Sequence, residues 1–136
     1  MTRRALLLIP LLTCLAAAAD PAQEVQDLFT GLAASLSAGN VTSFLAAFDK
    51  KMPGYEKLAE NIKTLAAQGT VESFVDVVSD EGDARQRKVE LDWRIRVKRE
   101  GDATAQSPRE GKLKCTAEKQ GKKWRITALE PVRFFE

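Results

Sequence analysis

The stretch from Val89 to Lys98, VELDWRIRVK, decides the fold. Its apolar side chains stand at every second position, and the residues between them are all charged. This period of two is typical of a β-strand with one buried and one solvated face. Val71 to Val78, upstream, is a second predicted strand, which an Asp80–Asp83 turn would join to the first. Residues 113–128, downstream, are expected to form a β-hairpin.

The hairpin pattern permits a prediction of its register. If Gln120 and Gly121 form a two-residue turn, Ala117 faces Trp124 and Cys115 faces Ile126. The same register adds Leu113–Ala128 to the apolar face and gives the polar face three pairs, Glu118–Lys123, Thr116–Arg125 and Lys114–Thr127. A slip of one residue would bury the charged side chains, so the apolar pattern favours this register.

Three amphipathic helices are predicted before the strands. The first begins with Asp20 as its N-cap and Pro21 at its first helical position, and ends at Gly39. Asn40 caps a short second helix, and a third runs from about Tyr55 to Gln68. The sequence therefore predicts an α+β domain, in which three N-terminal helices pack on an antiparallel sheet of about four strands.

The N-terminal 19 residues are predicted to be a signal peptide. Two arginines precede a short apolar run, and small residues at Ala17 and Ala19 favour cleavage after Ala19. The apolar run is too short for a permanent membrane span. Two alternatives stay open: acylation of Cys14, which would give a lipid anchor, and twin-arginine export. The expected mature domain is residues 20–136, located in the periplasm or outside the cell.

Charge limits the partners of that domain. Removing Arg3 and Arg4 from the 21 Lys and Arg residues leaves 19, which equals the number of Asp and Glu residues. Nucleic acids and anionic membranes select proteins with a basic excess, so neither is expected as the main partner. The helical half is acidic and the strand half basic, which suits two layers that attract each other.

Two segments carry a family resemblance: Ala38 to Leu45, AGNVTSFL, and Gly121 to Ile126, GKKWRI. With the order of helices and strands, they resemble the nuclear transport factor two-like superfamily, which includes ketosteroid-isomerase-like and polyketide-cyclase-like proteins. The resemblance covers about Ala22 to Glu136. It implies a cone-like fold, in which a strongly curved sheet wraps the helices and leaves a pocket at the wide end.

The residue types restrict the chemistry. The chain has no histidine, no glycine-rich phosphate loop and no cysteine cluster at metal spacing. No metal, cofactor or catalytic residue is therefore predicted. Cys115 is expected to face the core, where nothing activates its thiol. The resemblance places Asp49 near the cavity, and Tyr55 is the sole tyrosine.

The candidate pocket consists of residues that would lie on the helices or on the sheet face that meets them: Phe29, Asp49, Tyr55, Trp93 and Trp124. Each also has a structural interpretation. Asp49 is also typical of a solvated residue at a helix end, and Tyr55 of a residue at the edge of the core. The two tryptophans are also typical of ordinary core residues. Asp76 is expected on an edge or outer face, where it would guard against strand addition.

Three functions are weighed. The first is an exported, non-catalytic domain that binds a small apolar ligand or an envelope protein. The alternative is an isomerase, dehydratase or cyclase that uses a buried carboxylate and Tyr55. The third is a structural oligomerisation module. The densely charged outer sheet face favours a monomer over a polar homodimer.

Overall fold

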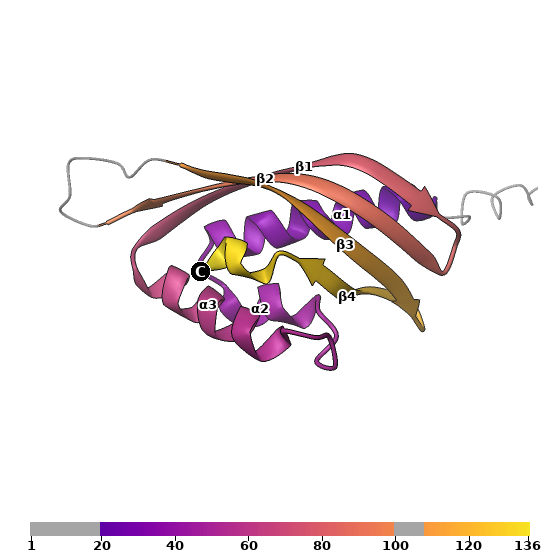
Figure 1. Ribbon diagram of the computed structural model, residues 1–136, viewed down its shortest axis with the longest axis horizontal. Helices are drawn as coiled ribbons and strands as arrows, with labels where there is room; N and C mark the ends of the chain where they lie inside the picture. The colour runs from indigo at the N-terminus through magenta and orange to yellow at the C-terminus, as the bar shows by residue number, and fades with distance from the viewer. Residues whose placement is uncertain (1–19, 100–107) are drawn as a thin grey trace, which may run out of the picture.

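The computed structural model describes residues 20–99 and 108–136, and these form three helices, four strands and a short C-terminal helix (Figure 1). The predicted signal peptide and the Cys14 alternative lie outside the described residues. In the described part of the chain, no helix is both long and apolar enough to cross a membrane.

The helices begin and end where the sequence predicts. Helix α1 spans Pro21–Ser37, and the Asp20 carboxylate accepts a hydrogen bond from the Ala22 N–H. Helix α2 spans Val41–Ala46 and is capped by the Asn40 side chain. Helix α3 spans Tyr55–Ala67. Gly39, between α1 and α2, has a φ of 72°, a left-handed conformation that glycine adopts without strain.

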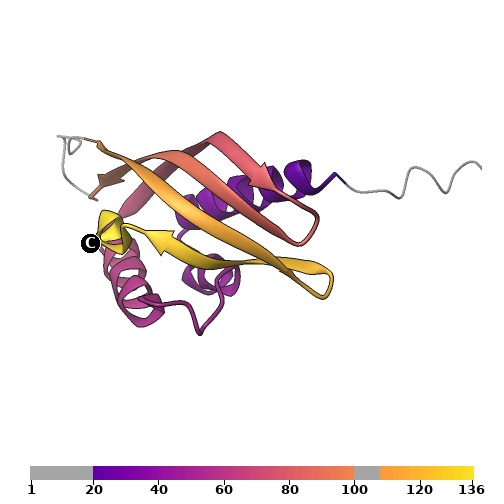
Figure 2. The ribbon, with the colours of Figure 1, turned by 45° about the vertical axis from the view of Figure 1, so that its right-hand side comes forward.

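The strands form one antiparallel sheet in the order β1-β2-β3-β4. Their bounds are Thr70–Gly82 for β1, Gln86–Lys98 for β2, Arg109–Gln120 for β3 and Lys123–Glu130 for β4. Strand β1 is longer than predicted, because the turn falls after Gly82 and is held by the Asp83 carboxylate. The sheet curves over the helices, which all lie on one of its faces (Figures 1 and 2). The predicted α+β fold class is confirmed.

The predicted register of the β3–β4 hairpin is wrong by two residues. The turn is Gly121–Lys122, so that Gln120 pairs with Lys123, Lys119 with Trp124 and Ala117 with Ile126. Gly121 supplies the positive φ, 67°, that the first turn position takes. A further irregularity after Ala117 shifts the pairing again, to Thr116 with Ala128 and Cys115 with Leu129. A slip of two keeps each side chain on its predicted face, so the apolar pattern could not exclude it. The irregularity then moves Ala128, which was expected on the apolar face opposite Leu113, to the face of Thr116, and Leu129 is buried in its place.

The core fills the space between the helices and the sheet. The inner face of β2 contributes the alternating residues of the deciding stretch, and all of them are buried. Helix α1 contributes Val25, Phe29, Leu32 and Leu36. After cis-Pro131, a 3-10 helix, η2, spans Val132–Phe135 and buries Phe134 and Phe135 in the core.

Two polar contacts fix α1 and β1 against the core. The Trp93 indole N–H donates to the Ser73 hydroxyl at 2.8 Å, and both residues are buried. The Ser73 main-chain N–H donates in turn to the hydroxyl of Ser37, at the end of α1, at 3.0 Å. The buried N–H of the Trp93 indole and the main-chain N–H of Ser73 therefore both have hydrogen-bond acceptors.

Candidate functional site

The structure does not gather the five predicted pocket residues into one cavity. Phe29 and Trp93 are inside the closed core, where they are 0% and 1% exposed. The Trp93 ring packs edge-on against Phe135, with 5.2 Å between ring centroids, and Phe44 lies on the same side at 6.3 Å. Aromatic rings occupy the interior at this point, so both predicted residues are core residues.

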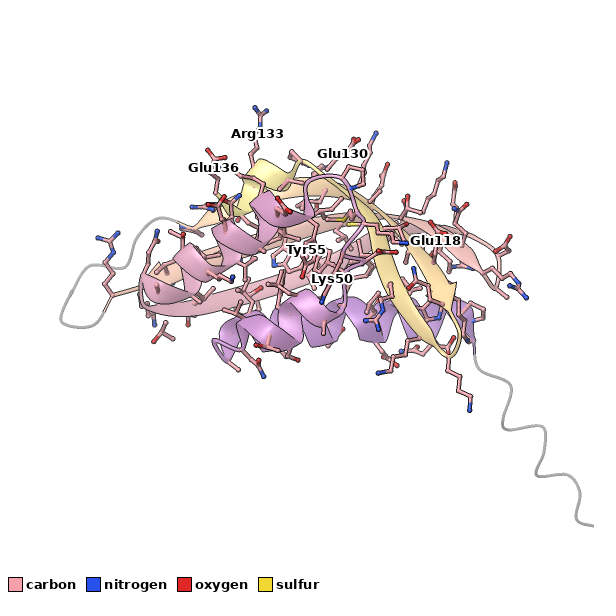
Figure 3. The ribbon with its side chains drawn as sticks, turned by 90° about the horizontal axis from the view of Figure 1, so that it is seen from below. Lys50, Tyr55, Glu118, Glu130, Arg133 and Glu136 are labelled. Atoms are coloured by element: carbon pink, nitrogen blue, oxygen red, sulfur yellow. The ribbon has the colours of Figure 1, made fainter. Side chains whose placement is uncertain are left out.

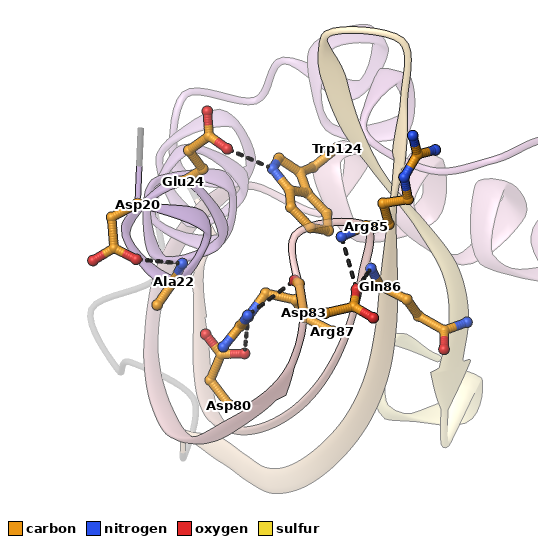
Figure 4. A network of polar contacts seen from close by, with 9 residues as sticks. All are labelled: Asp20, Ala22, Glu24, Asp80, Asp83, Arg85, Gln86, Arg87 and Trp124. Atoms are coloured by element: carbon orange, nitrogen blue, oxygen red, sulfur yellow. Dashed lines mark hydrogen bonds and ion pairs between the residues drawn. The ribbon is translucent and has the colours of Figure 1, made fainter. Parts of the chain in front are cut away.

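Trp124 closes the other end of the interface between α1 and the sheet. Its indole N–H donates to the Glu24 carboxylate at 3.0 Å (Figure 4). Lys119 Nζ donates to the same oxygen at 3.2 Å. The hydrogen bond from Trp124, followed by the one from Lys119, holds the pKa of Glu24 below its ordinary value. Trp124 is 7% exposed. It therefore joins α1 to β4 and leaves little surface for a ligand.

Asp49 and Tyr55 do come together, in a surface groove of about 600 Å³. The groove lies between α2, the start of α3 and the β3–β4 hairpin. Ten residues line it: Thr42, Leu45, Ala46, Phe48, Asp49, Lys50, Lys51, Tyr55, Gln120 and Arg125. Figure 3 shows Tyr55 and Lys50 close to each other in this region. We take this groove as the candidate site.

The connector between α2 and α3 forms one wall of the groove because it attaches to β4. The Ile126 N–H donates to the Ala47 carbonyl, and the Asp49 N–H donates to the Ile126 carbonyl, both at 2.9 Å. The Arg125 guanidinium also donates to the Ala46 carbonyl. The chain then turns back, and the Met52 N–H donates to the Asp49 carbonyl before α3 begins at Tyr55.

The Asp49 carboxylate is engaged at both oxygens. One accepts from the Lys51 main-chain N–H and the other from the Gln120 side chain, each at 2.8 Å. These hydrogen bonds, led by the one from Lys51, hold the pKa of Asp49 below its ordinary value. The carboxylate therefore stays ionised, is a weak base, and ties the connector to the hairpin.

The remaining lining divides into an apolar floor and a basic rim. Leu45, Phe48 and the Tyr55 ring supply the apolar part, and Phe48 is buried beneath it. Lys50, Lys51 and Arg125 set three cationic groups against the single carboxylate of Asp49. Such a groove can hold an apolar body while it attracts a negatively charged end.

Sequence reasoning missed the basic residues and Gln120. The two lysines look like ordinary connector residues, and Arg125 like an outward strand residue. Gln120 was expected in the turn itself, because the predicted register was displaced by two. The Gln120–Asp49 contact joins positions 71 apart in the chain, and no local pattern reports a contact of that span.

The described residues offer neither a metal-binding group of side chains nor an accessible thiol. No group of three or more His, Cys, Asp or Glu side chains there could hold a metal ion. Cys115 faces the core, as predicted, and burial raises the pKa of its thiol.

Comparisons with known proteins identify the fold. No protein-family model matches the chain, and no curated protein matches it in sequence. Among solved structures, an NTF2-like protein of unknown function from Shewanella oneidensis superposes with a TM-score of 0.63 at 15% identity, covering 81% of this chain and 97% of that one. A nuclear transport factor 2 (NTF2-like) superfamily protein from Salmonella enterica gives 0.63 at 16% identity, covering 79% and 86%.

A scytalone dehydratase-like protein from Novosphingobium aromaticivorans is also similar, with a TM-score of 0.65 at 12% identity, covering 79% of this chain and 80% of that one. At these identities the likeness concerns the fold alone. The chain has the NTF2-like fold, as the sequence predicts.

Proposed function

We propose that this protein is an exported, non-catalytic binding domain, and that the groove beside Tyr55 takes a small apolar ligand with a negatively charged end. The observation that carries this proposal is the composition of the groove, an apolar floor under a rim of Lys50, Lys51 and Arg125. Its volume of about 600 Å³ lies within the range of small-molecule sites, roughly 300–1,000 Å³.

Binding is favoured over catalysis because of the state of Asp49. A general base in an isomerase or dehydratase needs a pKa near the working pH, which burial normally provides. The pKa of Asp49 moves in the opposite direction, and both of its oxygens already accept hydrogen bonds. Tyr55 and Asp49 share the groove, but this carboxylate is poorly suited to take a proton.

The ligand class follows from the lining. An alkyl or aryl body would cover Leu45 and the Tyr55 ring, and a carboxylate would lie beside Lys50 and Lys51. Burial of the body supplies about 25 cal/mol for each Å² removed from water. The charged end adds orientation and a salt-dependent part of the affinity, because the rim is open to solvent.

Titration of residues 20–136 with decanoate and with decyltrimethylammonium tests the proposal. The two amphiphiles share an alkyl chain and differ in the sign of the head group. We expect decanoate to bind more tightly, to perturb the amide NMR signals of residues 45–55, and to bind about fivefold more weakly to Lys50→Glu.

Lys63→Glu is the matched control, because Lys63 is exposed on α3 and does not line the groove. It makes the same change in charge and should leave decanoate binding unaltered. Equal binding of the two amphiphiles, or signal changes confined to other parts of the chain, would refute the assignment of the groove.

A further inference from the structure

Strand β1 carries both large apolar side chains that are markedly exposed in the described residues. Phe74 is 63% exposed and Val78 is 55% exposed. Both lie on the outer face of the sheet, away from the helices, where each lines a surface hollow. Single exposed apolar residues are common on proteins, whereas two on one edge strand suggest an interaction surface.

A pair of carboxylates lies between these two apolar side chains. Asp76 is directly opposite Asp92 of β2, and both line the 440 Å³ hollow that also touches Phe74. The ion pairs of the described residues leave both out, since they join Arg87 to Asp80, Arg94 to Glu110, Lys98 to Glu72 and Lys119 to Glu24. Lys112 of β3 is directly opposite Asp92 and lines the same hollow, whereas Asp76, on the edge strand, has only Asp92 opposite it. Like charges directly opposite each other destabilise a sheet.

Among the described residues, no strand pairs with the main chain of β1 on the side away from β2. The strand is an edge of the sheet. The Ser73 N–H points away from β2, because it donates to Ser37. Alternation along an antiparallel pair directs the N–H and C=O groups of Val75 and Val77 to the same side. Open main-chain groups of this kind are where an extended segment of another protein can pair.

We propose that β1 docks an extended segment of another protein, in which a lysine or arginine stands between two apolar residues at alternate positions. Pairing with Val75 and Val77 places that cation beside Asp76 and Asp92. The flanking apolar side chains then cover Phe74 and Val78. The apolar contacts bury surface area at the interface. The cation relieves the repulsion between the carboxylates, so a basic segment is preferred.

Charge also decides against a second copy of this chain at the edge. All charged residues of β1 are acidic, namely Glu72, Asp76, Asp80 and Glu81. Self-pairing of β1 would bring two acidic strands together, which is costly. Asp76, expected from the sequence to guard against strand addition, therefore selects among partners instead. This surface is independent of the Tyr55 groove, since β1 and β4 are opposite edges of the sheet.

Synthetic peptides with blocked ends test the proposal. The probe is Thr-Val-Thr-Lys-Thr-Val-Thr, the charge control replaces its lysine with glutamate, and the pairing control carries N-methyl groups along one edge. Each is titrated into isotopically labelled residues 20–136, with the amide NMR signals of Val75 and Val77 as the readout. We expect the lysine peptide to shift these signals and to bind at least about tenfold more tightly than either control.

Reversing the charge on the protein completes the test. Asp76→Lys should reverse the preference between the two peptides, so that the glutamate peptide binds about tenfold more tightly than the lysine peptide. Asp27→Lys, on the exposed face of α1, makes the same change elsewhere and should leave the preference intact. Equal binding of the lysine and N-methyl peptides, no shift at Val75 and Val77, an unchanged preference in Asp76→Lys, or a stable dimer that covers Phe74 would overturn the proposal.

Discussion

Replacement of Ser73 by alanine should destabilise the domain far more than the loss of one small hydroxyl suggests. The Ser73 hydroxyl accepts the indole N–H of Trp93 at 2.8 Å, and Trp93 is 1% exposed. Alanine would leave that N–H buried without an acceptor. An unsatisfied buried donor costs about 1–3 kcal/mol, whereas most surface substitutions stay within about 0.5 kcal/mol.

Urea unfolding followed by Trp fluorescence measures this cost. We expect a lower midpoint at an unchanged m-value, since the substitution removes little surface. Ser43→Ala removes an exposed hydroxyl that takes part in a 3.2 Å hydrogen bond, and should cost less than about 0.5 kcal/mol.

A double-mutant cycle isolates the pair. Trp93→Phe removes the donor together with part of the ring, so Ser73→Ala should cost less than about 0.5 kcal/mol in the Trp93→Phe background. The reasoning is refuted if Ser73→Ala costs less than about 0.5 kcal/mol in the wild-type background, or the same in both.

Three further predictions concern packing, pH and the thiol. A Cβ at Gly111 would lie 2.7 Å from the Phe134 ring, so Gly111→Ala should destabilise by about 1–3 kcal/mol in thermal melts, and Phe134→Leu should recover part of that loss. The pKa values of Glu24, Asp49 and Asp83 are lowered in the folded state. The contribution of these carboxylates to the free energy of unfolding is therefore present above about pH 4.5, and it declines as the pH falls through their lowered folded-state pKa values. Urea midpoints should accordingly fall on acidification, and less so in Glu24→Gln. Cys115 is buried, so a thiol reagent should label it at the rate of unfolding, and rapid labelling of the folded protein would contradict its placement.

Local signals in the sequence predicted the elements well. Asp20, Asn40 and Gly39 set helix ends through contacts within a few residues, so their roles can be recognised without knowledge of the tertiary structure. The alternation from Val89 to Val97 likewise records which face of β2 is buried. These features follow from neighbouring residues, and the structure places them as expected.

Register and site depend on contacts that a local pattern does not encode. Slips of the hairpin by two residues keep the same faces, so alternation could not distinguish Ala117–Trp124 from Lys119–Trp124. The site shows the same limit. Asp49 and Tyr55 line one groove, but Phe29 and Trp93 could be assigned to core or cavity only once the positions of Phe44 and Phe135 were known.

The connector from Ala47 to Asp49 lies along β4 and occupies main-chain groups on that side of the sheet. The protein's own chain thus occupies this margin of the sheet at Ile126, whereas no strand of the described residues pairs with the opposite margin, β1. A sheet that can lengthen in one direction accepts one added strand and then stops, provided that strand presents a protected outer edge. Complexes formed through β1 should therefore contain one partner for each copy of this protein.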